Sequence, residues 1–440
     1  MTPSPSPSTV FRNALLVTQD PQRRVLCGDL AIEGGRITHV GPGGPRMEKE
    51  VDAHRFAIVP GFVNTHTHVA MSILRGLADD RDLGAFLERL FAVDAHRTDA
   101  DLEAGAAAGI AEMLLSGTTS FLDLYYGEDA IGRAVERLGI RGFLGWAVLD
   151  PSMTTQKGHP VENARGFLGR WDHHPRVTPL VAPQGVYVCS SETWLAARDL
   201  AAEKGTLLHY HLSETRREVH EHETKTGLRP PLWLDSIGAL GPGQVAAHGV
   251  WLTRREIQVL AERHVGVAHC PSSNLKLATG GVAPVQELRS AGAIVGLGTD
   301  SAASNNSLSM LREMHVAGLL QKHHLWEAEA LPAGALLDLA TIDGARLLGR
   351  AADLGSLEVG KQADLSLVRL DHPTLVPARR DTIISHLAYS ASEEAVHSVY
   401  VAGEPVVVDR QLVREPWERI HAAADECARS LWSAAGFPET

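Results

Sequence analysis

Four residues of the types that bind metal ions stand at or near the ends of short apolar runs in this sequence. His66 and His68 are separated by one residue, so the two-residue period of a strand puts both imidazoles on one face. Imidazole and carboxylate ligands suit zinc, and they also suit iron or manganese. The sequence therefore predicts one bound divalent ion, with Zn²⁺ expected and Fe²⁺ or Mn²⁺ as alternatives. The expected ligands are His66, His68, His211 and Asp300.

Repeated βα units are the elements that would position these ligands. Short β-branched runs alternate with longer segments rich in Ala, Leu, Glu and Arg, which is typical of a parallel sheet. Their number fits a (β/α)8 barrel, in which reacting groups come from the carboxyl ends of the strands. An open doubly wound sheet is the alternative, but no Gly-x-Gly-x-x-Gly follows the first strand. The expected strands are Ala57–Asn64, Thr118–Asp123, Arg141–Val148, Arg176–Ala182, Thr206–His211, Gln244–His248, Val265–His269 and Ile294–Asp300. Expected helices include Asp99–Ser116, Glu192–Lys204, Arg254–Glu262, Pro284–Ala291 and Leu308–Gln321.

Both ends of the chain have the pattern of small β units. Glu33-Gly34-Gly35-Arg36 has the composition of a hairpin turn between two apolar runs. We expect the two ends to form one small β-sandwich, with residues 1–59 and 353–440 flanking a barrel of residues 60–352 and ending in a closing helix. The expected strands are Val10–Thr18, Leu26–Glu33, Arg36–Val40, Asp364–Arg369, Val396–Val401 and Val406–Val408.

Composition excludes several classes of protein. The 440 residues carry 41 Lys and Arg against 53 Asp and Glu, a net charge of −12, so no broad cationic surface is available for nucleic acid or anionic membranes. No run of apolar residues is long enough to span a bilayer. The four cysteines are far apart in the sequence, which favours a reducing compartment, and we expect a cytoplasmic protein.

Four longer motifs carry a resemblance to a known family. They are Val59–His68 (VPGFVNTHTH), His211–Thr215 (HLSET), His269–Leu277 (HCPSSNLKL) and Gly298–Asn306 (GTDSAASNN). With them the sequence resembles the amidohydrolase superfamily, above all the S-adenosylhomocysteine/5'-methylthioadenosine deaminases and related chlorohydrolases. The resemblance covers nearly the whole chain. It implies a distorted barrel with a β-sandwich, a small-molecule heterocyclic substrate, and a homodimer or larger homo-oligomer.

Acid–base residues flank the expected ion. A divalent ion lowers the pKa of water toward about 7, which yields a nucleophile for an aromatic carbon that bears an amino group. Asp300 is placed to take the proton of that water, and Glu214 is placed to protonate the ring nitrogen and then the departing ammonia. The resemblance assigns His248 to hold the nucleophile or the oxyanion. A solvated carboxylate at a helix start is the alternative for Glu214.

Two departures from the family pattern concern the substrate. Gln184 replaces a base-contacting His of the nucleoside deaminases, and its amide can read a carbonyl-plus-NH edge or can cap a loop. The segment Phe86–Asp94 lacks the family's Trp residues and its ribose-binding Glu, for which Asp94 is the candidate substitute. Further candidate substrate contacts are Tyr187, Asn274 and Ser304.

The sequence thus favours a metal-dependent deaminase of an amino-substituted N-heterocycle, with adenosine-type nucleosides such as S-adenosylhomocysteine or 5'-methylthioadenosine as leading substrates. Deamination of a free base or pterin of the cytosine, guanine or isoxanthopterin type is an alternative, as is a chlorohydrolase or cyclic amidohydrolase. A non-catalytic scaffold is disfavoured because every proposed ligand and proton-transfer residue is present.

Overall fold

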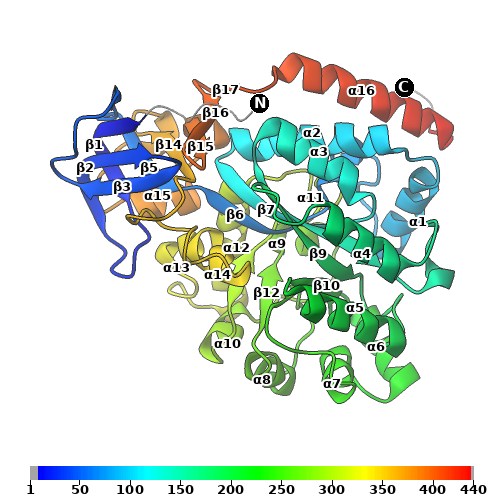
Figure 1. The fold of residues 1–440 in the computed structure, drawn as a ribbon. Helices are drawn as coiled ribbons and strands as arrows, with labels where there is room; N and C mark the ends of the chain where they lie inside the picture. The colour runs from blue at the N-terminus through cyan, green and yellow to red at the C-terminus, as the bar shows by residue number, and fades with distance from the viewer. Residues whose placement is uncertain (1–7, 438–440) are drawn as a thin grey trace.

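The middle of the chain forms a barrel of eight parallel strands in the computed structural model, which describes residues 8–437 (Figure 1). The strands follow one another around the barrel in chain order, and a bridge between Thr67 and Asp300 brings its two edges together. The fold class expected from the sequence is therefore confirmed. The strands are β6 (Phe62–Thr67), β7 (Thr118–Tyr125), β8 (Arg141–Val148), β9 (Val177–Pro183), β10 (Leu208–Leu212), β11 (Gln244–His248), β12 (Val265–His269) and β13 (Val295–Leu297).

Two predicted barrel strands are wrong in their extent: Ile294–Asp300 is longer than β13, which covers only Val295–Leu297, and the first predicted strand joins two strands. The expected strand Ala57–Asn64 is two strands, β5 (Phe56–Pro60) and β6, which belong to different sheets. Gly61 separates them where the backbone passes so close to Thr119 that a Cβ at Gly61 would lie 2.2 Å from that side chain. The first barrel strand therefore begins after Gly61, contains His66 and ends at Thr67, directly before His68.

Helices cover the outside of the barrel (Figure 1). Helix α8 has the predicted bounds, and α2 and α5 differ from the predicted helices by one residue at one end. Thr98 and Thr253 start α2 and α8 with capping boxes, in which the threonine hydroxyl and an acidic side chain three residues later satisfy exposed backbone N–H groups. The helices are α1 (Leu83–Asp94), α2 (Asp99–Leu115), α3 (Glu128–Leu138), α4 (Pro160–Arg170), α5 (Ser191–Lys204), α6 (Arg216–Thr226), α7 (Pro230–Ser236), α8 (Arg254–Glu262), α9 (Pro271–Lys276), α10 (Val285–Ser290), α11 (Ala302–Asn305), α12 (Met310–Leu325), α13 (Ala333–Ala340), α14 (Ile342–Leu347), α15 (Ile383–Tyr389) and α16 (Trp417–Ala434).

The two ends of the chain meet in one mixed sheet, in the order β17-β16-β15-β14-β5-β1-β2-β3 with β4 paired to β1. Antiparallel pairing of β5 with β14 joins the N-terminal and C-terminal strands into a continuous ladder around its own small apolar core. The predicted hairpin turn is confirmed, because Gly34 and Gly35 both have positive φ. The domain boundaries at residues 59/60 and 352/353 stay a prediction, and the outer ends of those ranges, 1–7 and 438–440, lie outside the described residues. The remaining strands are β1 (Thr9–Val17), β2 (Val25–Glu33), β3 (Arg36–Gly41), β4 (Lys49–Asp52), β14 (Leu365–Arg369), β15 (Val396–Val401), β16 (Glu404–Val408) and β17 (Gln411–Leu412).

The C-terminal helix α16 packs against α2 and the short helix η1 (Val69–Leu74), which follows His68 (Figure 1). The Trp432 Nε1–H group donates to the Ile73 carbonyl at 3.1 Å. The predicted closing helix thus supports the segment that follows the predicted ligands. No helix within residues 8–437 combines the length and the apolar character needed to cross a membrane.

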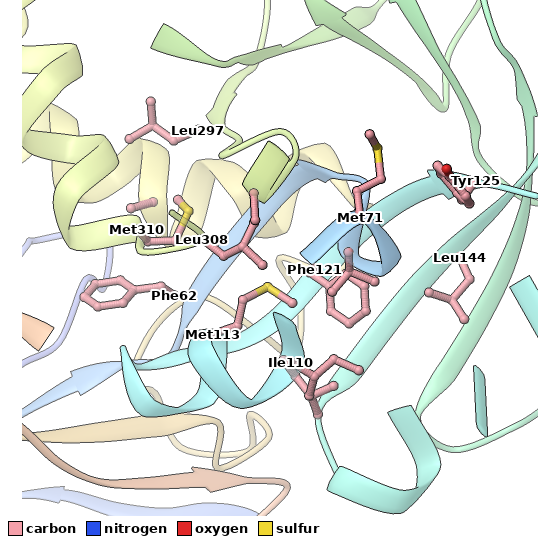
Figure 2. Packing of buried hydrophobic residues seen from close by; sticks show 14 of the residues in the cluster. Phe62, Met71, Ile110, Met113, Phe121, Tyr125, Leu144, Leu297, Leu308 and Met310 are labelled. Atoms are coloured by element: carbon pink, nitrogen blue, oxygen red, sulfur yellow. The ribbon is translucent and has the colours of Figure 1, made fainter. Parts of the chain in front are cut away.

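A large apolar core fixes the first barrel strands against helix α2. Phe62 of β6 and Phe121 of β7 are fully buried beside Ile110 and Met113 of α2 (Figure 2). Burying a side chain of this size stabilises the fold by about 1.5–3 kcal/mol. The strand that carries His66 and leads into His68 is therefore held on its outer side by packed side chains.

Candidate metal centre and cavity

The four predicted metal ligands meet at the carboxyl end of the barrel. His66 lies on β6 and His68 directly after it, His211 lies on β10, and Asp300 lies beyond the end of the short strand β13. The Asp300 Oδ1 atom is 3.6 Å from His66 Nε2 and 3.5 Å from His68 Nε2. Gly298 permits this approach, because a Cβ at that position would lie 2.8 Å from the His66 Cβ.

Backbone carbonyls fix the protonation of two ligands. His68 Nδ1 lies 2.5 Å from the Leu124 carbonyl oxygen, and His211 Nδ1 lies 2.7 Å from the Gln184 carbonyl oxygen. A carbonyl only accepts, so each Nδ1 carries a proton, and in the neutral form of the ring Nε2 presents a lone pair. These two Nε2 atoms are 3.2 Å apart, and a cation between their lone pairs would stabilise that arrangement.

His66 completes the set of imidazoles. Its Nε2 atom is buried without a hydrogen-bond partner, and its Nδ1 atom lies 2.8 Å from Nε2 of His209. Burial, together with the neighbouring imidazoles, lowers the pKa of His66 and of His211 well below the usual value. Both rings are therefore neutral, which is the form that binds metal ions.

His248 lies at the same centre but presents a proton to it. The Asn274 Nδ2 amide donates to His248 Nδ1 at 3.1 Å, so the proton of the neutral ring lies on Nε2. That Nε2 atom is 3.8 Å from Glu214 Oε2. His248 therefore offers a hydrogen-bond donor where the three other histidines offer lone pairs, although its position alone is also compatible with metal binding.

Asp300 is held by hydroxyl and backbone donors. Its Oδ2 atom accepts hydrogen bonds from Ser273 Oγ at 2.5 Å and from Ser304 Oγ at 3.2 Å, and its Oδ1 atom accepts from the Ser301 N–H group at 2.8 Å. Asp300 has a φ of 60°, and His248 has a φ of 74°. Such left-handed backbone is strained for these residues and is often found at functional sites.

Glu214 is a buried carboxyl group that faces the centre. It lies between the end of β10 and the N-cap Thr215 of α6, so it is not the solvated helix residue of the alternative interpretation. The Glu218 carboxylate accepts the N–H groups of Ser213 and Glu214 at 2.9 and 2.8 Å. Burial raises the pKa of Glu214 to about 8, and the nearby charge of Asp300 adds to this effect.

A cavity of about 520 Å³ opens onto these groups. Its apolar wall comes from one face of α1, and its polar floor contains His68, His211, Glu214, His248 and Asp300. The α1 residues that line it include Leu83, Phe86, Leu87, Leu90 and Phe91. The cavity therefore combines a polar floor with an apolar wall, as small-molecule sites commonly do.

The structure brings four of the five predicted substrate contacts to the cavity. Gln184, Tyr187, Asp94 and Ser304 line it, and Tyr187 is 45% exposed. Asn274 is not among the lining residues and contacts His248 instead. Its role as a substrate contact stays a prediction, and the structure shows its amide directed from α9 to an imidazole.

Several residues at the site were not predicted from the sequence. The Tyr125 hydroxyl donates to Asp94 Oδ2 at 3.0 Å, and the Arg97 guanidinium contacts both groups. The only sequence signal for this trio was the spacing of Asp94 and Arg97 on adjacent helical turns. Glu218 follows Glu214 by four residues, and His209 belongs to the His-Tyr-His run of the fifth barrel strand.

Known proteins share both the sequence and the fold. The family model described as "Amidohydrolase family" matches residues 57–406. A 5-methylthioadenosine/S-adenosylhomocysteine deaminase of Nitratidesulfovibrio vulgaris is 41% identical over 91% of this chain and 92% of that protein. A 5'-deoxyadenosine deaminase of Methanothrix thermoacetophila is 40% identical over 84% of this chain and 88% of that protein. The structure of a Xanthomonas campestris adenosine deaminase with bound zinc has a TM-score of 0.92 and 33% identity, and covers 97% of this chain and 98% of that chain.

Proposed function

The chain belongs to the amidohydrolase family, and we propose that it is a metal-dependent deaminase of adenosine-type nucleosides. The observation that carries the proposal is the meeting of three Nε2 lone pairs and the Asp300 carboxylate beside Glu214, a buried acid, at the floor of a cavity. The names of the relatives support the reaction and the substrate class.

Each polar group of the floor has a role in hydrolysis. A divalent ion bound by His66, His68, His211 and Asp300 would supply Lewis acidity and lower the pKa of water toward about 7. Asp300 accepts the proton of the attacking water. Glu214, which is protonated at neutral pH, donates its proton to the ring nitrogen beside the carbon under attack. It then relays the proton that Asp300 took from the water to the departing ammonia, and it recovers its own proton from the hydroxyl group added to that carbon. The His248 Nε2–H group stabilises the oxyanion that develops on that carbon.

The cavity walls suit a nucleoside. Asp94 lies beside the Tyr125 hydroxyl and can accept hydrogen bonds from ribose hydroxyls, while the apolar face of α1 suits a substituent of low polarity at the 5' position. We propose Zn²⁺ as the ion, because the ligand set suits it and the Xanthomonas campestris relative contains it. Cytoplasmic location and homo-oligomer formation stay predictions from the sequence.

The test is ammonia release by zinc-loaded protein. 5'-Methylthioadenosine, S-adenosylhomocysteine, 5'-deoxyadenosine and adenosine are assayed beside cytosine, guanine and a pterin, and chloride release from a chlorinated triazine is measured in parallel. We expect the nucleosides to have the highest kcat/KM and Asp300→Asn to abolish the reaction. Ammonia from the free bases or the pterin alone would refute the nucleoside assignment, and chloride without ammonia would refute deamination.

A further inference from the structure

His209 is a buried imidazole that the proposed reaction does not use. It lies on β10 two residues before His211, and it is fully buried. Its Nε2 atom is 2.8 Å from His66 Nδ1, and its Nδ1 atom is 2.8 Å from the Val245 carbonyl oxygen. Because β6 and β10 are not neighbours in the barrel sheet, this contact crosses the barrel interior. His209 thus links a proposed ligand on one strand to the backbone of β11.

The Val245 carbonyl group, at one end of this series of hydrogen bonds, decides which nitrogen carries the proton in His209 and in His66. Val245 O can only accept, so His209 Nδ1 carries a proton. In the neutral ring the other nitrogen, Nε2, has a lone pair, and this lone pair faces His66 Nδ1 at 2.8 Å. The Nε2 atom of His209 is therefore an acceptor, and His66 Nδ1 must donate to it. The remaining nitrogen of neutral His66, Nε2, then has no proton.

We propose that His209 is a positioning residue that holds His66 in the tautomer whose Nε2 is free to bind the metal ion. His68 and His211 obtain the same tautomer directly from carbonyls, those of Leu124 and Gln184. His66 obtains it through a second imidazole, whose own proton is fixed by a carbonyl. The inference rests on the proposed metal site but not on the identity of the substrate.

Two amide substitutions separate the two contacts of His209. In His209→Gln the longer side chain can place its amide oxygen where Nε2 lies, which keeps the acceptor for His66. In His209→Asn the shorter side chain reaches only the Nδ1 position, which keeps the donor to Val245 and loses the acceptor. His209→Leu removes both contacts. Tyr210→Phe is the matched control, since it removes a buried hydroxyl from the same strand that bonds to Gln244 and not to the site.

The readout is the zinc dissociation constant, measured by chelator competition without substrate, together with the visible spectrum of the Co²⁺-loaded proteins. Loss of a group that orients a ligand typically costs about 10–100-fold in metal affinity. We expect that loss in His209→Asn and His209→Leu, with an altered Co²⁺ spectrum, and affinity within a few-fold of wild type in His209→Gln and Tyr210→Phe.

The outcomes separate this inference from the proposed function. Equal zinc affinity in wild type and His209→Asn would overturn the positioning role, as would an equal loss in His209→Gln and His209→Asn. If His209→Leu does not fold, the zinc affinities of His209→Gln and His209→Asn still test the positioning role. A wild-type protein that binds no metal would instead refute the metal site, whereas zinc binding without deamination would refute only the proposed reaction.

Discussion

Substituting Glu214 with Gln tests the proposed proton donor most directly. The two side chains have nearly the same shape, but the amide cannot deliver a proton to the substrate. Burial raises the pKa of Glu214 to about 8, so at pH 7 about ten molecules carry the proton for each one that does not. General acid–base catalysis contributes about 10²–10⁴-fold to rates, and we expect Glu214→Gln to lower kcat/KM by a factor in that range.

The pH profile gives a second signature of the same group. Because the protonated carboxyl group is the active form, kcat/KM of the wild type should be level below about pH 8 and fall about tenfold per unit above it. In Glu214→Gln the residual activity should lack this alkaline decline. Ammonia release with 5'-methylthioadenosine is measured from pH 6 to 10, with zinc content determined on every sample.

A matched variant controls for the loss of negative charge. Glu223 is an exposed residue of α6 outside the cavity lining, so Glu223→Gln should retain the wild-type rate and profile. Zinc content should be unchanged in both variants, since Glu214 is not a proposed ligand. An alkaline decline that persists unchanged in Glu214→Gln, or a kcat/KM equal to that of the wild type, would refute the role of Glu214 as the acid.

Three further substitutions test the surroundings of the site. Asp94→Ala should lower kcat/KM for adenosine about 10–100-fold, which is the value of a hydrogen bond to a charged group, and should leave kcat/KM for 2',3'-dideoxyadenosine nearly unchanged. Equal losses on both substrates would contradict recognition of the ribose hydroxyls by Asp94. Asn274→Asp should reverse the tautomer of His248, because a carboxylate accepts a hydrogen bond and would draw the ring proton to Nδ1. The variant should have a kcat about 10²–10³-fold lower at unchanged zinc content, and an unchanged kcat would refute the role of His248 as a donor. Asp364→Asn should lower the free energy of unfolding in urea by about 3–5 kcal/mol, because it leaves Arg141 charged and buried; a loss below about 1 kcal/mol would contradict this account.

Local patterns predicted most of the barrel because its strands are short apolar runs between longer helical segments. The ligand pair at the end of β6 was predictable for the same reason, since the period of a strand places His66 and His68 together. The split at Gly61 was missed because the apolar pattern continues through it, and only the approach of Thr119 shows that the chain changes sheets there.

Contacts between distant segments were the part that the sequence could not predict. Tyr125 reaches Asp94 from the end of β7, and no periodicity relates a residue on a strand to one at the end of a separate helix. Asn274 was expected at the site, but its contact with His248 was not predictable, because it depends on which way α9 turns its amide. Side chains at one end of a barrel have many possible neighbours, and packing selects among them.

Histidines at the centre have two opposite roles, since some present a lone pair for a metal ion and one presents a proton. The group that contacts Nδ1 decides which role each ring has. Where a strand end places a carbonyl oxygen against Nδ1, as Leu124 and Gln184 do, the imidazole presents a lone pair. Where an amide N–H group of Asn274 faces Nδ1, the imidazole presents a proton. Each carbonyl lies at the end of the barrel strand next to the one that carries or leads into its imidazole, β7 beside β6 and β9 beside β10, so the parallel arrangement itself prepares two rings for a cation. The donor to His248 comes from a side chain of α9, the helix that follows β12.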